Sequence, residues 1–197
     1  MSNAITIFRT LLTLPLFALL AFGGNAWLAL AFFLGAGLLD VIDGKVARAR
    51  NEVSPFGAMI DLIGDRLLTV AVVFGLALGG SKGAIVGIVL IVRDLVVASL
   101  NEAAPGKLAI RVGVIEKLKI VMAFTGLSLL IVAKGCAQTS ASQIAEWPTA
   151  PDAGWASGVL GAMIEQAGAV VLALAAALTL ITLLDYWRRA LRAFKQA

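Results

Sequence analysis

Apolar runs of about 20 residues recur along almost the whole chain, and a run of this length can cross a bilayer as an α-helix. Lipid offers no partner to backbone polar groups, and these runs lack the alternation of barrel strands, so helices are expected. Because 60% of the 197 residues are apolar and only 14% are charged, no stretch is left for a separate soluble domain. The sequence therefore predicts an all-α, polytopic membrane protein with a single domain, residues 1–197.

Breaks rich in glycine, proline and asparagine divide the apolar sequence into six predicted transmembrane helices, which we expect to form a bundle. Their expected ranges are 5–23, 26–48, 54–79, 82–101, 114–134 and 164–187. The segment 135–163 contains Pro148, Pro151 and several glycines and serines, so it is expected to be one longer loop, with a surface turn of helix around residues 144–147. The first apolar run could imitate a signal peptide, but an uncleaved first span is expected.

Lysines and arginines lie mostly at one set of helix ends, which predicts an orientation. With a cytoplasmic N-terminus, thirteen of the sixteen basic residues lie on or near the cytoplasmic side, and only Lys82 and Lys134 fall at the opposite face. Arg93 lies within the fourth span. This pattern suits a bacterial-type inner (cytoplasmic) membrane. It also accounts for the net charge of +4, so membrane lipids are expected partners and nucleic acid is not.

Four aspartates, Asp40, Asp43, Asp61 and Asp65, lie at the predicted cytoplasmic ends of the second and third spans. Acids in membrane helices are costly and by default indicate a functional site. The spacing within each pair, three and four residues, places both carboxylates on one helix face. The chain has no histidine and one cysteine, so a metal must bind to oxygen. Oxygen ligands suit Mg²⁺, Mn²⁺ or Ca²⁺, and four carboxylates could hold two ions.

Small residues lie one helical turn from these acids: Gly44 and Ala47 follow the first pair and Gly57 precedes the second. They leave backbone exposed to a ligand, and Arg48 adds a planar cation suited to phosphate oxygens. Close helix packing could explain the small residues alone, and solvation could explain one aspartate. Neither alternative explains the whole ordered set.

The order Asp-x2-Asp-Gly-x2-Ala-Arg-x8-Gly-x3-Asp-x3-Asp over residues 40–65 resembles the signature of the CDP-alcohol phosphotransferase (CDP-alcohol phosphatidyltransferase) family. The six-span layout and Asn3, Thr6 and Arg9 ahead of the first span extend the resemblance. It implies a six-helix membrane bundle, usually a homodimer, with two metals, Mg²⁺ or Mn²⁺, beneath the nucleotide. The implied reaction belongs to phospholipid biosynthesis: a phosphatidyl group passes from CDP-diacylglycerol to an acceptor alcohol, and CMP is released.

The resemblance also implies roles for the motif residues. Asp40, Asp43 and Asp61 would bind metal, and Asp65 would be the general base while also touching one metal. The expected pocket for the CDP moiety consists of Gly44, Ala47, Arg48 and Gly57.

The later sequence is similar to that of phosphatidylglycerophosphate synthases, whose basic residues there contact the phosphate of glycerol 3-phosphate. Arg93, Lys117 and Lys119 match that pattern, and Arg111 could complete an anion pocket. Interfacial anchoring is the alternative for the two lysines. The chain has Asn101, Glu116 and Ile120 where those synthases typically carry Arg, Gly and Thr.

A phosphorylated acceptor, glycerol 3-phosphate, is therefore expected. Phosphatidylglycerol, inositol phosphate, serine and choline are the alternative acceptors.

Three other functions fit the sequence less well. A membrane prenyltransferase also uses acids and Mg²⁺, but its motifs lack the Ala-Arg and x8-Gly elements. A carboxylate-lined cation carrier would be expected to show a repeated half, and no convincing repeat is present. An inactive family member would not be expected to keep all four acids.

Overall fold

The structure is a computed structural model that describes residues 2–50, 55–103, 114–146 and 155–195. Over these ranges the chain is helical and contains no strand. The helices are α1 (Ser2–Ala21), α2 (Ala26–Arg50), α3 (Pro55–Leu78), the short 3-10 helix η1 (Lys82–Val86), α4 (Gly87–Ala103), α5 (Val114–Glu146) and α6 (Trp155–Lys195). The predicted all-α class is confirmed.

Three stretches of the described chain are long and apolar enough to cross a membrane: Lys82–Leu100, Val114–Ser142 and Gly158–Arg188. Ile7–Ala21 and Ala26–Asp40 are shorter apolar helices. Large apolar side chains such as Phe22, Leu38 and Leu78 are exposed along the helices, which a soluble surface would not tolerate in such number. The chain is a membrane protein, while the number of its spans stays a prediction.

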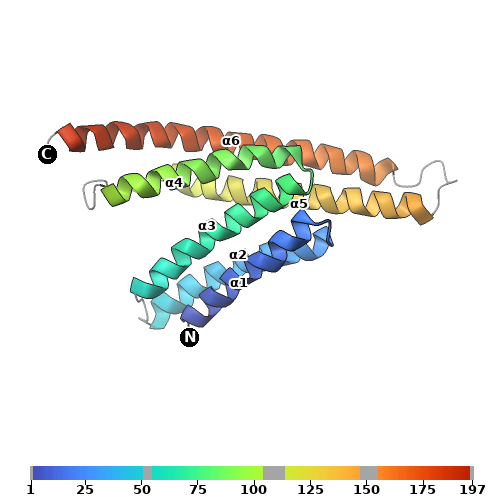
Figure 1. Cartoon of the computed structure of the whole chain (residues 1–197), viewed down its shortest axis with the longest axis horizontal. Coiled ribbons are helices and arrows are strands. Elements are labelled where there is room, and N and C mark those ends of the chain that lie inside the picture. The colour runs from blue at the N-terminus through green and yellow to red at the C-terminus, as the bar shows by residue number, and fades with distance from the viewer. Residues whose placement is uncertain (1, 51–54, 104–113, 147–154, 196–197) are drawn as a thin grey trace.

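The helices form two groups, as Figure 1 shows. In the first group α1 packs on α2 and α3, and in the second α5 runs along α6 beside α4. The groups meet near the α1–α2 turn and η1, and they diverge toward the start of α3 and the end of α4. Buried side chains from both groups, including Leu20, Val72 and Ile131, form one core where the groups meet.

Polar contacts join the two groups at the end where they meet. Lys134 Nζ on α5 donates a hydrogen bond to the carbonyl oxygen of Gly79, 2.8 Å away, just after α3. The Ser81 hydroxyl lies 3.0 Å from Glu165 Oε1 on α6. These contacts hold the two helix groups together at one end of the molecule, and the groups diverge toward the other end.

The predicted loop over residues 135–163 is wrong for residues 135–146 and 155–163, because α5 continues to Glu146 and α6 begins at Trp155; residues 147–154 lie outside the described part of the chain. Part of the cause is packing: an added Cβ on Gly135 would lie 2.8 Å from the ring of Trp27, so glycine permits this contact instead of ending the helix. Gln138 continues the contact, because its Nε2 donates to Gly24 O at 2.8 Å and its Oε1 accepts from Ala26 N–H at 2.9 Å. Tertiary contacts with the α1–α2 turn therefore support a helix that composition alone did not predict.

Candidate functional site

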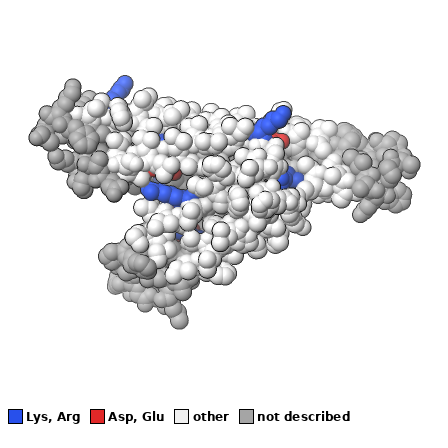
Figure 2. All heavy atoms as spheres, viewed as in Figure 1, with Lys and Arg blue, Asp and Glu red and all other residues white. Residues whose placement is uncertain are grey.

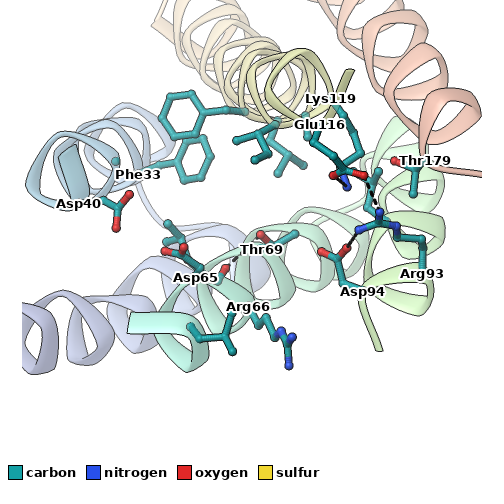
Figure 3. A pocket seen from close by; sticks show the side chains of 18 of the residues that line it. Phe33, Asp40, Asp65, Arg66, Thr69, Arg93, Asp94, Glu116, Lys119 and Thr179 are labelled. Carbon is teal, nitrogen blue, oxygen red and sulfur yellow. Dashed lines mark hydrogen bonds and ion pairs between the residues drawn. The ribbon is translucent and has the colours of Figure 1, made fainter. Parts of the chain in front are cut away.

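A cavity of about 610 Å³ lies between the two helix groups, and all six α-helices contribute to its lining. Figure 2 shows a mostly uncharged surface over the described residues, with charged atoms at the hollow between the two helix groups. In the close view of Figure 3, Asp40 and Asp65 lie on one side of the cavity and Arg93, Asp94, Glu116 and Lys119 on the other. Two charged clusters therefore face one cavity.

Arg9 of α1 organises the first cluster. Its Nη1 forms an ion pair with Asp40 Oδ1 of α2 and lies 3.0 Å from Asp65 Oδ1 of α3. The guanidinium is only 2% exposed, whereas the Asp65 side chain is 53% exposed and points into the cavity region. Three helices thus place two carboxylates around one buried positive charge.

Gly64 permits this close approach of α1 and α3. An added Cβ on Gly64 would lie 2.8 Å from Thr10 Oγ1 and 3.3 Å from Arg9 Nη2, so a side chain there would press on the arginine. The glycine immediately before Asp65 therefore helps to determine where the guanidinium lies.

Arg93 of α4 is the centre of the second cluster. Its Nη1 lies 3.0 Å from Asp94 Oδ1, and its Nη2 lies 2.8 Å from Glu116 Oε1 of α5. Lys119 Nζ lies 2.7 Å from the other oxygen, Glu116 Oε2. Arg93 also stacks toward the ring of Tyr186 on α6, with 5.9 Å between its Cζ and the ring centroid. Asp94 and Glu116 are therefore carboxylate partners of this arginine within a predicted span.

Two stacked aromatic rings form part of the cavity lining. Phe33 of α2 and Phe124 of α5 stack with ring centroids 4.5 Å apart and an interplanar angle of 22°. Gly37 makes room for this stack, because an added Cβ there would lie 2.8 Å from two atoms of the Phe124 ring. Both rings line the cavity.

The remaining predicted residues divide into three sets. Lys117 is exposed and does not line the cavity, because two residues along a helix turn its side chain roughly 200° away from Lys119. Arg111 lies outside the described residues. The backbone is helical but the side chain is not described for Asp43, Gly44, Ala47, Arg48, Gly57 and Asp61.

The cluster around Arg9 has the chemistry of a cation site. Two carboxylates from different helices converge on one positive group, and this all-oxygen donor set fits a hard divalent cation. No group of three acids, cysteines or histidines suited to a metal occurs among the side chains that are described, a set that excludes Asp43 and Asp61. The metal ligands therefore stay a prediction.

Sequence reasoning missed three contributors to the site: Gly37, Gly64 and the carboxylate of Glu116. Arg9 was placed near the cytoplasmic side, but its contact with both acids was not anticipated. A glycine next to a motif aspartate is a usable signal for Gly64. Glu116 already stood out as a departure from the pattern of the similar synthases.

Comparisons with known proteins identify the family of the chain. The model of the CDP-alcohol phosphatidyltransferase family matches residues 1–181. A CDP-diacylglycerol–glycerol-3-phosphate 3-phosphatidyltransferase of Rickettsia typhi is 29% identical over 191 residues, which cover 94% of each chain. A probable phosphatidylglycerophosphate synthase of Mycobacterium tuberculosis is 29% identical over 98% of this chain and 82% of its own.

A human CDP-diacylglycerol–inositol 3-phosphatidyltransferase is 48% identical, but only over 50 residues, 25% of this chain and 24% of its own. The resemblance first found in residues 40–65 is thereby confirmed over most of the chain. This chain belongs to the CDP-alcohol phosphatidyltransferase family and is an enzyme of that type.

Proposed function

We propose that this protein transfers the phosphatidyl group of CDP-diacylglycerol to glycerol 3-phosphate and releases CMP. The observation that carries the proposal is that acids suited to a divalent metal face two buried cations suited to a phosphate across one cavity. Two relatives that match more than nine tenths of this chain are named as a glycerol-3-phosphate phosphatidyltransferase and a probable phosphatidylglycerophosphate synthase. Their names support the same acceptor.

In this proposal the acids of α2 and α3, Asp40, Asp43, Asp61 and Asp65, hold one or two divalent cations, Mg²⁺ or Mn²⁺. When bound, such ions would neutralise the pyrophosphate and so favour departure of CMP.

Asp65 is proposed to accept the proton of the acceptor hydroxyl. Arg9 Nη1 lies 3.0 Å from its Oδ1, and the half-exposed carboxylate faces the cavity. The acceptor oxygen then bonds to the phosphatidyl phosphorus, and the bond from that phosphorus to the CMP oxygen breaks. The cavity holds both reactants at fixed positions, which supplies the entropic part of the acceleration.

Arg93 and Lys119 are proposed to bind the phosphate of the acceptor. Each is 7% exposed, and both line the cavity opposite Asp65. A buried cation pair is screened little by salt and favours an anionic over a neutral acceptor. Gly44, Ala47, Arg48 and Gly57 are proposed to form the pocket for the CDP moiety, on the strength of their match to the family motif.

The proposed setting is the bacterial-type inner membrane, with six spans, both termini and the cavity on the cytoplasmic side, and a homodimer as the working assembly. The distribution of lysine and arginine supports this orientation. Chemical labelling of single cysteines introduced on either side would test the orientation, and mass measurement of the detergent-solubilised protein would test the dimer.

An acceptor screen tests the reaction. Purified protein in detergent is given CDP-diacylglycerol, Mg²⁺ and one acceptor at a time: glycerol 3-phosphate, serine, inositol phosphate, choline or phosphatidylglycerol. CMP release is expected with glycerol 3-phosphate, and a chelator of divalent ions should abolish it. Asp65→Asn should lose activity with its membrane insertion intact, while Lys82→Gln should keep its activity, because Lys82 is exposed and does not line the cavity. Release with a neutral acceptor alone would contradict the proposal.

A further inference from the structure

Glu116 lies where an anion would be expected to bind. Its two carboxylate oxygens contact two different cations, Oε1 with Arg93 Nη2 at 2.8 Å and Oε2 with Lys119 Nζ at 2.7 Å. The Glu116 side chain is 16% exposed, and all three residues line the cavity (Figure 3). A carboxylate that spans two buried cations has the same contacts as two oxygens of a phosphate group.

The charges of this cluster cancel. Arg93 and Lys119 are positive, and Asp94 and Glu116 are negative, so the four side chains together are neutral. Without Glu116 the cluster would carry one positive charge. Asp94 is 44% exposed, but Arg93, Lys119 and Glu116 are largely buried, so salt screens their charges only weakly. The carboxylate therefore weakens the attraction of the pocket for any incoming anion.

A purely structural role explains less. Glu116 lies in the first turn of α5, where an acid interacts favourably with the helix dipole. An exposed acid in that turn would serve the dipole equally well, and it would not need to contact two cations on the wall of a cavity. The dipole accounts for the residue type but not for where the carboxylate points.

Arg93 has one donor that no described residue uses. It is 7% exposed, and its Nε is buried with no hydrogen-bond acceptor among the described residues. An unpaired buried donor is costly, so a ligand oxygen that reached it would be favoured. Besides Glu116, the terminal nitrogens contact Asp94 and, at 3.4 Å, Thr182 Oγ1.

We propose that Glu116 is an internal competitor for the acceptor phosphate and sets the affinity for a phosphorylated acceptor. This inference rests on the proposed function. The phosphate displaces the carboxylate from Arg93 and Lys119, and no covalent bond changes. A phosphate monoester carries about −1.5 to −2 charges and three acceptor oxygens, against one charge and two oxygens for the carboxylate, so the exchange favours the phosphate. Because the phosphate must first displace the carboxylate, the site binds the phosphate less tightly than it would without Glu116.

Kinetics of matched variants test the proposal. Glu116→Gln keeps the size of the side chain and removes its charge, and Glu116→Ala removes the side chain beyond Cβ. Glu165→Gln makes the same chemical change where the helix groups meet, near Ser81. We expect both Glu116 variants to lower the KM for glycerol 3-phosphate about ten-fold, because they remove a charge-assisted competitor, with kcat within about two-fold of the original. The KM for CDP-diacylglycerol should be unchanged, and Glu165→Gln should match the original protein.

The opposite result would show that Glu116 orients the two cations instead of competing for them. In that case the KM for glycerol 3-phosphate would be unchanged or higher in both Glu116 variants, and the inference would be wrong.

A second measurement separates this inference from the proposed acceptor. Inorganic phosphate is titrated against the thermal unfolding of the intact protein in detergent, without CDP-lipid or acceptor. We expect Glu116→Gln to reach half of its maximal stabilisation at about one tenth of the phosphate concentration that the original protein needs. If glycerol 3-phosphate supports no CMP release, the proposed function fails and this titration decides the inference. Equal phosphate concentrations for the two proteins would overturn it.

Discussion

The ion pairs of Arg9 offer a direct test of how the first cluster is held together. Arg9→Gln keeps a polar side chain of similar length but removes the positive charge between Asp40 and Asp65. Removing one partner of a fully buried ion pair costs roughly 3–5 kcal/mol. Here the arginine is 2% exposed, but the two carboxylates are 39% and 53% exposed, so water can solvate them after the change. We therefore expect a loss of about 2 kcal/mol in unfolding free energy, roughly half of the fully buried value.

Thermal unfolding in detergent measures this loss through the fluorescence of the four tryptophans. For a chain of this length, about 2 kcal/mol corresponds to a Tm lower by roughly 4–8 °C. The measurement is made with a chelator present, so that a divalent cation cannot take the place of the guanidinium. Arg9→Lys should lose about half as much, because lysine keeps the charge but lacks the planar fork that contacts two acids.

Lys82→Gln is the matched control, since it removes an exposed cation at the end where the helix groups meet and should shift Tm by no more than about 1 °C. If the Tm of Arg9→Gln stays within that same range of the original value, the guanidinium does not hold the acids together and the reasoning is refuted.

Two packing predictions follow from single contacts. Gly37→Ala places a Cβ 2.8 Å from the Phe124 ring and should lower the unfolding free energy by about 1–3 kcal/mol, measured as a lower Tm. Gly35→Ala is the control and should not lower it, because no atom lies within 4 Å of its added Cβ. Gln138→Ala removes two hydrogen bonds to the backbone of the α1–α2 turn and should lower the unfolding free energy by about 2 kcal/mol. Ser142→Ala, on the exposed side of α5, is the control and should lower it by under about 0.5 kcal/mol. Equal Tm values for the two variants would contradict the role of Gln138.

The helical class and most helix positions could be predicted because lipid leaves few alternatives. Four of the six α-helices begin within three residues of the predicted start, and the start predicted at residue 82 is instead that of η1. The error lies between residues 135 and 163, where glycine, serine and proline were interpreted as loop signals. Those signals reflect local preference, and side chains such as Gln138 receive their partners from a turn more than 100 residues earlier. Composition contains no information about such a partner.

The site shows the same division between local and distant information. Helical spacing suffices to place the two motif acids of each helix on one face, but it does not say what lies between Asp40 and Asp65. That answer, Arg9, depends on how α1 packs on both helices, and therefore on Gly64. Spacing should have separated the two lysines of α5, because residues two apart on a helix point in nearly opposite directions. Lys119 reaches the cavity and Lys117 does not.

The two clusters indicate why such a cavity can be stable without its substrates. Charges in a largely apolar protein are costly unless each is paired, so the protein must supply partners for the groups that will later bind ligand. Arg9 forms such ion pairs with the acids, and Glu116 forms them with the cations on the opposite side of the cavity. In the proposed function, ligand binding would be an exchange of ion pairs, and the measured affinity would be the difference between the new pair and the old one. Substitutions that weaken the internal pair should therefore tighten ligand binding even as they destabilise the fold, and this opposite sign distinguishes a competitor from a scaffold.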